Sequence, residues 1–296
     1  MKQTITFLIL VFLALTSCNE KGKNTTNNKM EKITDTLNFK NGHSEVNGLR
    51  MYYEIYGKGK PLVLIHGGGS TIQSTFEKVI PLFAKNRKVL AVELQAHGRT
   101  NDRNADLTFE QDADDVAILL KNLKIGKADF FGFSNGGTTT LQIAIRHPEI
   151  VDKIILGSAL FNRNGVPEQV WGFMKQASLE NMPEQLKDSY KKVASDPGRL
   201  QVMHDKDAKR MVTFKDIPDD KIKSIKAPTF IIIGDKDVIK PEHAIEMQRL
   251  ITNSELAIIP GGHGEYIGEI TTLKPNFKES DFVVVQMIES FLDKKE

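Results

Sequence analysis

Apolar residues follow two alternating patterns along the chain from Leu49 onward. Short runs of β-branched and aromatic residues predict strands, and longer segments with apolar residues three or four positions apart predict helices. Their alternation indicates an α/β fold with a mostly parallel sheet flanked by helices. The predicted strands are 49–56, 61–66, 88–94, 129–133, 150–159, 228–234 and 256–260, and the predicted helices are 72–84, 108–123, 135–147, 241–251 and 282–292.

Residues 160–226 interrupt this alternation. The segment is rich in Lys, Glu and Asp, its apolar residues recur at helical spacing, and it contains no obvious strand. We therefore expect a helical cap inserted between two core segments, 37–159 and 227–296. The large apolar residues of the cap either line a substrate pocket or pack its helices together; they are Trp171, Phe173, Met174, Met203, Met211 and Phe214.

The first residues differ from the rest of the chain. Lys2 precedes an uninterrupted apolar stretch at 7–15 that ends in small residues, which predicts a signal peptide over 1–17. The stretch is shorter than the roughly 20 apolar residues that span a bilayer, so we expect no permanent membrane span there.

The sequence LTSC at 15–18 resembles the lipobox of bacterial lipoproteins, in which the signal is cut before the cysteine and the new N-terminal cysteine is acylated. The resemblance implies that Cys18, the single cysteine of the chain, carries a lipid anchor. We therefore expect an exported protein on the bacterial cell envelope, at the outer membrane or a membrane facing the periplasm. Residues 18–36, rich in Asn, Lys and Thr, predict a disordered tether.

Charge is balanced over the 296 residues. The chain has 40 basic and 38 acidic side chains, a formal net charge of +2, and no long block of one sign. Because a nucleic-acid partner requires clustered positive charge, we expect none. The sequence leaves the oligomeric state open.

A motif for nucleophilic catalysis follows the predicted strand at 129–133. The sequence GFSNG at 132–136 has the form G-x-S-x-G and opens the predicted helix at 135–147. Small residues on both sides of Ser134 permit a tight turn that places the hydroxyl at the carboxyl end of the sheet and at a helix N-terminus. This context predicts Ser134 as the nucleophile.

A serine nucleophile requires a base and a carboxylate that orients the base. His263 follows the predicted strand at 256–260, and both Asp235 and Asp237 follow the one at 228–234. Because parallel strands place such loops at one edge of a sheet, we expect these side chains near Ser134. We predict His263 as the base, and either aspartate as the acid.

From about Leu49 to its C-terminus, the chain resembles the capped serine hydrolases of the α/β-hydrolase fold superfamily. The order Ser, Asp, His is that of this fold, and Asp237 matches the family's G-x-x-D position. The sequence ELQAHGR at 93–99 resembles the family's D-x-x-G-H-G-x loop, with Glu93 and Ala96 replacing the usual Asp and Gly. The resemblance therefore favours Asp237 over Asp235 as the acid.

The sequence HGGG at 66–69 resembles the oxyanion loop of the same fold. The resemblance implies that the backbone amides of Gly68 and Asn135 stabilise the negative charge of an acyl-transfer intermediate. We expect His66 to brace this loop without taking part in proton transfer.

These features predict hydrolysis of a carboxylic ester or related small acyl compound through an acyl-enzyme, with no cofactor and no metal. The same triad serves C–C, lactone or amide hydrolysis and perhydrolysis, and the fold does not decide among them. A non-catalytic ligand-binding module is a further alternative, which the complete triad disfavours. The substrate depends on the cap and is left open.

Overall fold

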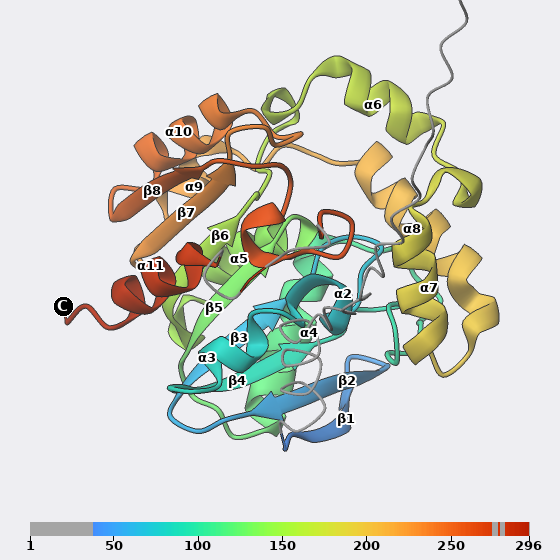
Figure 1. The fold of residues 1–296 in the computed structure, drawn as a ribbon, viewed down its shortest axis with the longest axis horizontal. Helices are drawn as coiled ribbons and strands as arrows, with labels where there is room; N and C mark the ends of the chain where they lie inside the picture. Colours follow the sequence, from blue (N-terminus) through green and yellow to red (C-terminus); the bar gives the residue numbers. More distant parts are fainter. Residues whose placement is uncertain (1–37, 274–277, 279–281, 296) are drawn as a thin grey trace, which may run out of the picture.

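A computed structural model describes residues 38–273, 278 and 282–295. They form an eight-stranded sheet with the order β1-β2-β4-β3-β5-β6-β7-β8 (Figure 1). Strand β2 is antiparallel to β1 and β4, and all other pairs are parallel, which confirms the predicted fold class. The strands are β1 Lys40–Val46, β2 Leu49–Tyr56, β3 Lys60–Ile65, β4 Arg87–Val92, β5 Ala128–Phe133, β6 Val151–Gly157, β7 Thr229–Gly234 and β8 Ser254–Ile259.

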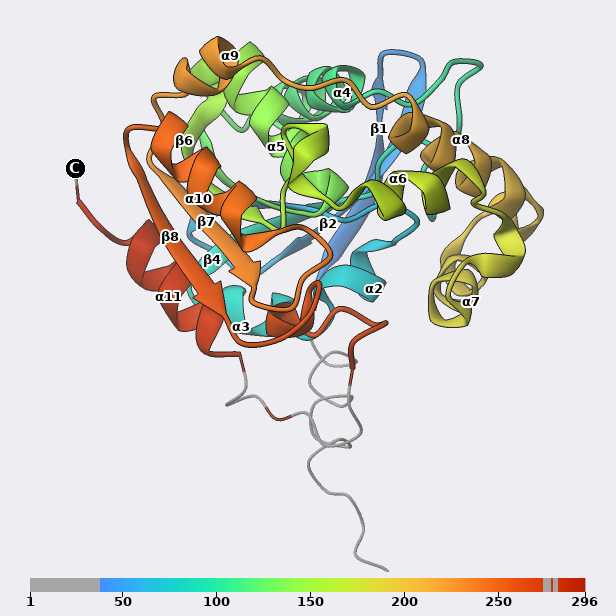
Figure 2. The same ribbon diagram turned by 90° about the horizontal axis from the view of Figure 1, so that it is seen from above.

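Helices cover both faces of the sheet (Figure 2). Because successive strand residues point to opposite faces, Val63 and Ile65 of β3 pack on one side and Leu62 and Leu64 on the other. Each fully buried side chain of this size contributes about 1.5–3 kcal/mol. On the first side lie α4 Phe109–Asn122, α5 Asn135–Arg146 and α10 Pro241–Leu250, and on the second lie α2 Ile72–Phe76, α3 Ile80–Phe83 and α11 Val283–Leu292.

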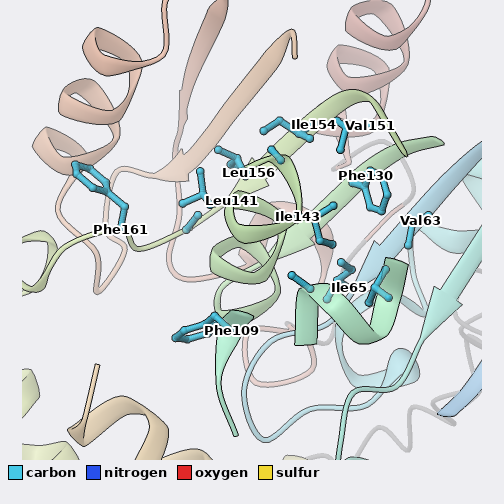
Figure 3. Packing of buried hydrophobic residues seen from close by; sticks show 14 of the residues in the cluster. Val63, Ile65, Phe109, Phe130, Leu141, Ile143, Val151, Ile154, Leu156 and Phe161 are labelled. Carbon is cyan, nitrogen blue, oxygen red and sulfur yellow. The ribbon is translucent and has the colours of Figure 1, made fainter. Parts of the chain in front are cut away.

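The packing under α5 fixes the segment that carries the predicted nucleophile. Figure 3 shows Leu141 and Ile143 of α5 beside Ile65, Phe130 and Leu156 of three neighbouring strands. All five side chains are completely buried. Helix α5, which begins directly after Ser134, is therefore packed against β3, β5 and β6.

The single helix predicted over 72–84 is wrong. The structure has two short helices, α2 and α3, with a break at residues 77–79. Pro81 explains the break, because proline has no N–H to donate and its ring clashes with the carbonyl four residues earlier in a continuous helix. Pro81 instead lies in the first turn of α3, where proline is tolerated.

The predicted cap segment, residues 160–226, is helical and contains no strand. Its helices are α6 Glu168–Lys175, α7 Glu184–Val193, α8 Leu200–Val212 and α9 Asp219–Lys223. Helices α6, α7 and α8 stand together at one end of the sheet, whereas α9 lies near α5 and α10 (Figures 1 and 2). The cap that faces the predicted site is therefore made by α6, α7 and α8.

The predictions for the N-terminus lie outside the described residues. They concern the signal peptide at 1–17, Cys18 and the tether at 18–36. Within 38–273 and 282–295, no helix has both the length and the apolar character needed to cross a membrane.

Candidate active site

Ser134 lies at a sharp turn between β5 and α5. Its φ is 54°, a left-handed value that is rare for a residue with a side chain. The flanking glycines allow this turn, because a Cβ at Gly132 would lie 2.0 Å from the carbonyl oxygen of Gly136, and one at Gly136 would lie 2.1 Å from that of Ile65. The turn has the strand-turn-helix geometry that exposes a nucleophilic serine above an α/β sheet.

His263 lies between Ser134 and Asp237. The Ser134 hydroxyl can donate to His263 Nε2 at 3.0 Å, and His263 Nδ1–H donates to Asp237 Oδ1 at 2.7 Å. The other aspartate, Asp235, is exposed and instead accepts from the backbone N–H of Gly261 at 2.7 Å. The structure thus brings Asp237, and not Asp235, into contact with the histidine.

The electrostatics of the pair suit a base held by a carboxylate. Burial raises the pKa of Asp237. The charge and hydrogen bond of His263, together with the hydrogen bonds from Ser158 and Ile239, outweigh burial and hold the pKa of Asp237 below its usual value. Burial lowers the pKa of His263, but the Asp237 carboxylate has the larger combined effect, so the pKa of His263 lies above its ordinary value. Asp237 therefore stays ionised while His263 gains basicity.

The loop at 66–69 lies directly beside the start of α5. A Cβ at Gly68 would lie 2.4 Å from Asn135 Nδ2, so a side chain at this position would require Asn135 to move. Asn135 is the first residue of α5, where backbone N–H groups have no partner within the helix. Both predicted oxyanion residues line the same pocket as Ser134.

His66 braces this loop. Its Nδ1–H donates to the carbonyl oxygen of Gly67 at 2.7 Å, and its Nε2 accepts from the N–H of Leu94 at 3.1 Å. Burial, helped by the neighbouring His97, lowers the pKa of His66 to about 3, so the ring is neutral, as this arrangement requires. A neutral, doubly bonded imidazole is a structural support for the loop.

Two residues that we did not predict support the acid. Ser158 Oγ–H donates to Asp237 Oδ2 at 2.6 Å, and the Tyr266 hydroxyl lies 2.9 Å from Ser158 Oγ. Burial raises the pKa of Tyr266, so its hydroxyl keeps its proton and can donate to Ser158. The sequence position of Ser158 could have indicated its role. Ser158 directly follows β6, and β6 lies between the strands that precede Ser134 and Asp237.

A cavity of about 340 Å³ opens above Ser134 and His263. Its far walls come mainly from the cap and the loop after β7 and are mostly apolar, with polar exceptions that include Asn181, His204 and Asp207. Of the six cap residues considered from the sequence, Trp171, Phe173, Met174 and Met211 line the cavity. The other two join helices, since Met203 packs with Tyr190 and Phe214 stacks on Trp171.

The described lining of this cavity contains no Lys or Arg. Its charged or titratable side chains are Asp207, His204 and His263. Two guanidinium groups are held against lining residues: Arg210 pairs with Asp207 and also with Asp112, and Arg163 lies 3.9 Å above the Trp171 ring. Among the described residues no cluster of three or more His, Cys, Asp or Glu side chains is placed to hold a metal ion.

A serine at a strand-helix elbow, with His and Asp following on later strands of a mostly parallel sheet, defines the α/β-hydrolase class. The family model for the alpha/beta hydrolase fold matches residues 60–224, more than half of the chain, so the chain belongs to this family. It is 37% identical over 133 residues to 2-hydroxymuconate semialdehyde hydrolase of Pseudomonas sp. (strain CF600), covering 43% of this chain and 47% of the relative. The matched region thus spans about half the length of such curated relatives.

Solved structures show the same fold. The 2-hydroxy-6-oxo-6-phenylhexa-2,4-dienoate hydrolase of Rhodococcus sp. strain RHA1 is similar with a TM-score of 0.71 at 20% identity, over 88% of this chain and all of the other. The enol-lactonase of Burkholderia xenovorans LB400 is similar with a TM-score of 0.67 at 20% identity, over 85% of this chain and all of the other.

Proposed function

We propose that this protein is a serine hydrolase that cleaves neutral, apolar carboxylic esters or related acyl compounds. The observation that carries the proposal is the hydrogen-bonded chain from Ser134 through His263 to Asp237. This chain lies at one end of a cavity whose other walls are mostly apolar. Such a cavity takes an uncharged acyl group and aims its carbonyl at the serine.

The geometry supports a two-step acyl transfer. Ser134 Oγ attacks the carbonyl carbon while His263 Nε2 takes the hydroxyl proton, and the amides of Gly68 and Asn135 stabilise the oxyanion. His263 then donates that proton to the leaving alcohol, which breaks the ester bond and leaves an acyl group on Ser134. In the second step His263 removes a proton from water and the water oxygen attacks the acyl carbon. His263 then returns the proton to Ser134 Oγ as the acyl–oxygen bond breaks, which releases the acid and free Ser134.

A carboxylate-bearing substrate fits this cavity poorly. The name of the Rhodococcus neighbour, a dienoate hydrolase, describes such a substrate. A buried carboxylate needs a cation or several donors to offset the loss of water. The described lining offers no Lys or Arg and already contains one carboxylate, Asp207.

Hydrolysis of a C–C bond or a lactone is a second candidate. It is favoured by relatives and neighbours whose names describe semialdehyde, dienoate and enol-lactone substrates. The triad serves these reactions as well as ester cleavage. Substrate charge separates the candidates, because the lining favours a neutral ester or lactone over a carboxylate-bearing C–C substrate.

The proposal is tested by steady-state hydrolysis of two p-nitrophenyl esters matched in length, the valerate and the hemiglutarate, which carries a carboxylate at its far end. We expect kcat/KM to be at least about tenfold higher for the valerate, equivalent to about 1.4 kcal/mol. Ser134→Ala corrects for background hydrolysis and should abolish turnover of both esters. Equal rates for Ser134→Ala and wild type, or a preference for the hemiglutarate, would contradict the proposal.

We further propose that the protein works on the cell envelope, tethered by lipid on Cys18. The support is the LTSC sequence at 15–18 after an apolar stretch, followed by a polar segment. Two or more acyl chains on one cysteine give stable anchoring, since each buried methylene contributes about 0.8 kcal/mol.

A further inference from the structure

Asp207 connects the cap to the loop at 66–69. It lies on cap helix α8, and its Oδ2 accepts from the backbone N–H of Gly69 and lies 3.2 Å from His97 Nε2. The contact with the loop backbone is close, because a Cβ at Gly68 would lie 2.9 Å from the same oxygen. A carboxylate from the cap therefore holds the backbone on which the predicted oxyanion donor lies.

The charge of Asp207 is held by fixed partners. Arg210 Nη2 donates to its Oδ1, and Arg210 Nη1 donates to Asp112 Oδ2 at 2.7 Å. Burial raises the pKa of Asp207, but the charges of Arg210 and His97 outweigh burial and hold the pKa far below its usual value. Asp207 is thus ionised, and a carboxylate is a stronger acceptor for the Gly69 amide than a neutral group.

Both ring nitrogens of His97 face oxygen acceptors. Nδ1 lies 2.8 Å from the carbonyl oxygen of Gln95, and Nε2 lies 3.2 Å from Asp207 Oδ2. The ring also lies 4.9 Å from that of His66, the residue that braces the loop from the core. The loop is therefore held from the core by His66 and from the cap by Asp207.

We propose that Asp207 is a positioning residue for the oxyanion hole, and that its carboxylate, by accepting from the Gly69 N–H, keeps the neighbouring Gly68 amide correctly placed. The inference rests on the proposed function, because it assigns a role in stabilising the charge that forms when Ser134 attacks. Asp207 is not the acid of the triad, since Asp237 holds His263 and both Asp207 oxygens have partners of their own.

The alternative to a positioning role is a purely structural one, in which Asp207 only joins the cap to the core. The chain offers a matched control in Asp102, whose side chain is also nearly buried. It pairs with two cap residues, Arg199 at 2.8 Å and Lys206 at 2.7 Å, without touching the loop at 66–69. Asp102→Asn weakens ion pairs between cap and core, as Asp207→Asn does, but it keeps the Asp207 carboxylate that accepts from the Gly69 N–H.

The experiment measures the second-order rate at which an alkyl fluorophosphonate labels Ser134 in the full-length wild type, Asp207→Asn and Asp102→Asn. This reaction develops negative charge on the phosphoryl oxygen and does not depend on the natural substrate. Loss of an oxyanion donor lowers rates by roughly 100- to 1000-fold, and we expect a displaced donor in Asp207→Asn to lower the rate about 10- to 100-fold. Asp102→Asn should remain within about threefold of the wild type, since the partners of Asp102 are Gln95, Arg199 and Lys206 rather than the loop at 66–69.

A second readout separates positioning from general loss of structure. A trifluoromethyl ketone forms an oxyanion adduct with Ser134, whereas the corresponding alcohol fills the cavity without one. In Asp207→Asn the Ki of the ketone should rise by the same factor as the labelling rate falls, and the Ki of the alcohol should not change. Equal losses for both ligands, equal effects of the two substitutions, or labelling at the wild-type rate would overturn the inference. Failure of the wild type itself to be labelled would instead overturn the proposed function.

Discussion

At the residue scale, the site depends on a few atoms in unusual positions. Ser134 has a positive φ, and two glycines without room for a Cβ make its turn possible. Asp237 Oδ1 accepts from His263, and Oδ2 accepts from Ser158. Both carboxylate oxygens are therefore committed, which fixes the tautomer and the orientation of the imidazole.

The two aspartates of the loop after β7 provide a direct comparison. Asp237→Asn should lower kcat by roughly 1000- to 10,000-fold, because an amide favours the wrong tautomer of His263. Asp235→Asn should stay within about threefold of the wild type, because its Oδ1 can still accept from Gly261. Steady-state kinetics with a p-nitrophenyl ester measure both, and a larger loss in Asp235→Asn would reverse the assignment.

The pKa of His263 predicts the acid limb of the pH profile. The imidazolium form cannot accept the Ser134 proton, so kcat/KM should rise with pH as His263 loses its proton. Because the pKa of His263 is raised by the Asp237 carboxylate, the midpoint should lie above the ordinary value of 6.5. In Asp237→Asn the midpoint of the remaining activity should move downward. A midpoint below 6.5 in the wild type would contradict the assigned electrostatics.

At the element scale, strand ends and one inserted cap build the site. Sequence periodicity predicted seven of the eight strands, all except β1, and the helical segment at 160–226, because each pattern depends on neighbouring residues. The pattern failed at 72–84, where Pro81 outweighed a continuous helical spacing of apolar residues. It also could not show that Asp207 contacts Gly69 or that Met203 faces other helices, because these contacts join segments far apart in the chain.

Two phenylalanines of the cap segment test how it is held together. Phe214 is buried between the rings of Trp171 and Phe109, whereas Phe173 is 56% exposed. Phe214→Ala should lower the free energy of unfolding by about 3–5 kcal/mol, and Phe173→Ala should change it by no more than about 0.5 kcal/mol. Urea denaturation followed by fluorescence of Trp171, the single tryptophan, measures both. Equal unfolding midpoints for the two variants would show that Phe214 does not secure the cap.

At the scale of the whole molecule, two apolar cores on opposite faces of the sheet support a site at one edge of it. The cap is joined to the core partly by ion pairs, among them Lys206 with Asp102 and Lys209 with Asp106. The motifs predicted which strand ends meet, since chain order and sheet direction determine it. The charge of the cavity could not be predicted, because it depends on which cap residues face inward.

Membrane attachment is a prediction for the whole protein. Full-length protein expressed in a bacterial host should sediment with membranes, and Cys18→Ser should not, because the acylated side chain is lost. Ser17→Ala is the matched control, since it keeps a small residue next to the cysteine and should remain in the membrane fraction. Membrane association of Cys18→Ser equal to that of the wild type would contradict the proposal.

The central claim is that Ser134 is a nucleophile activated by His263. The most direct measurement is peptide mass spectrometry after reaction with a fluorophosphonate, with His263→Ala as the comparison. The account predicts one covalent adduct, on Ser134, in the wild type and a labelling rate reduced by at least about 1000-fold in His263→Ala. An adduct on another residue, or labelling of Ser134 at the same rate in both proteins, would contradict it.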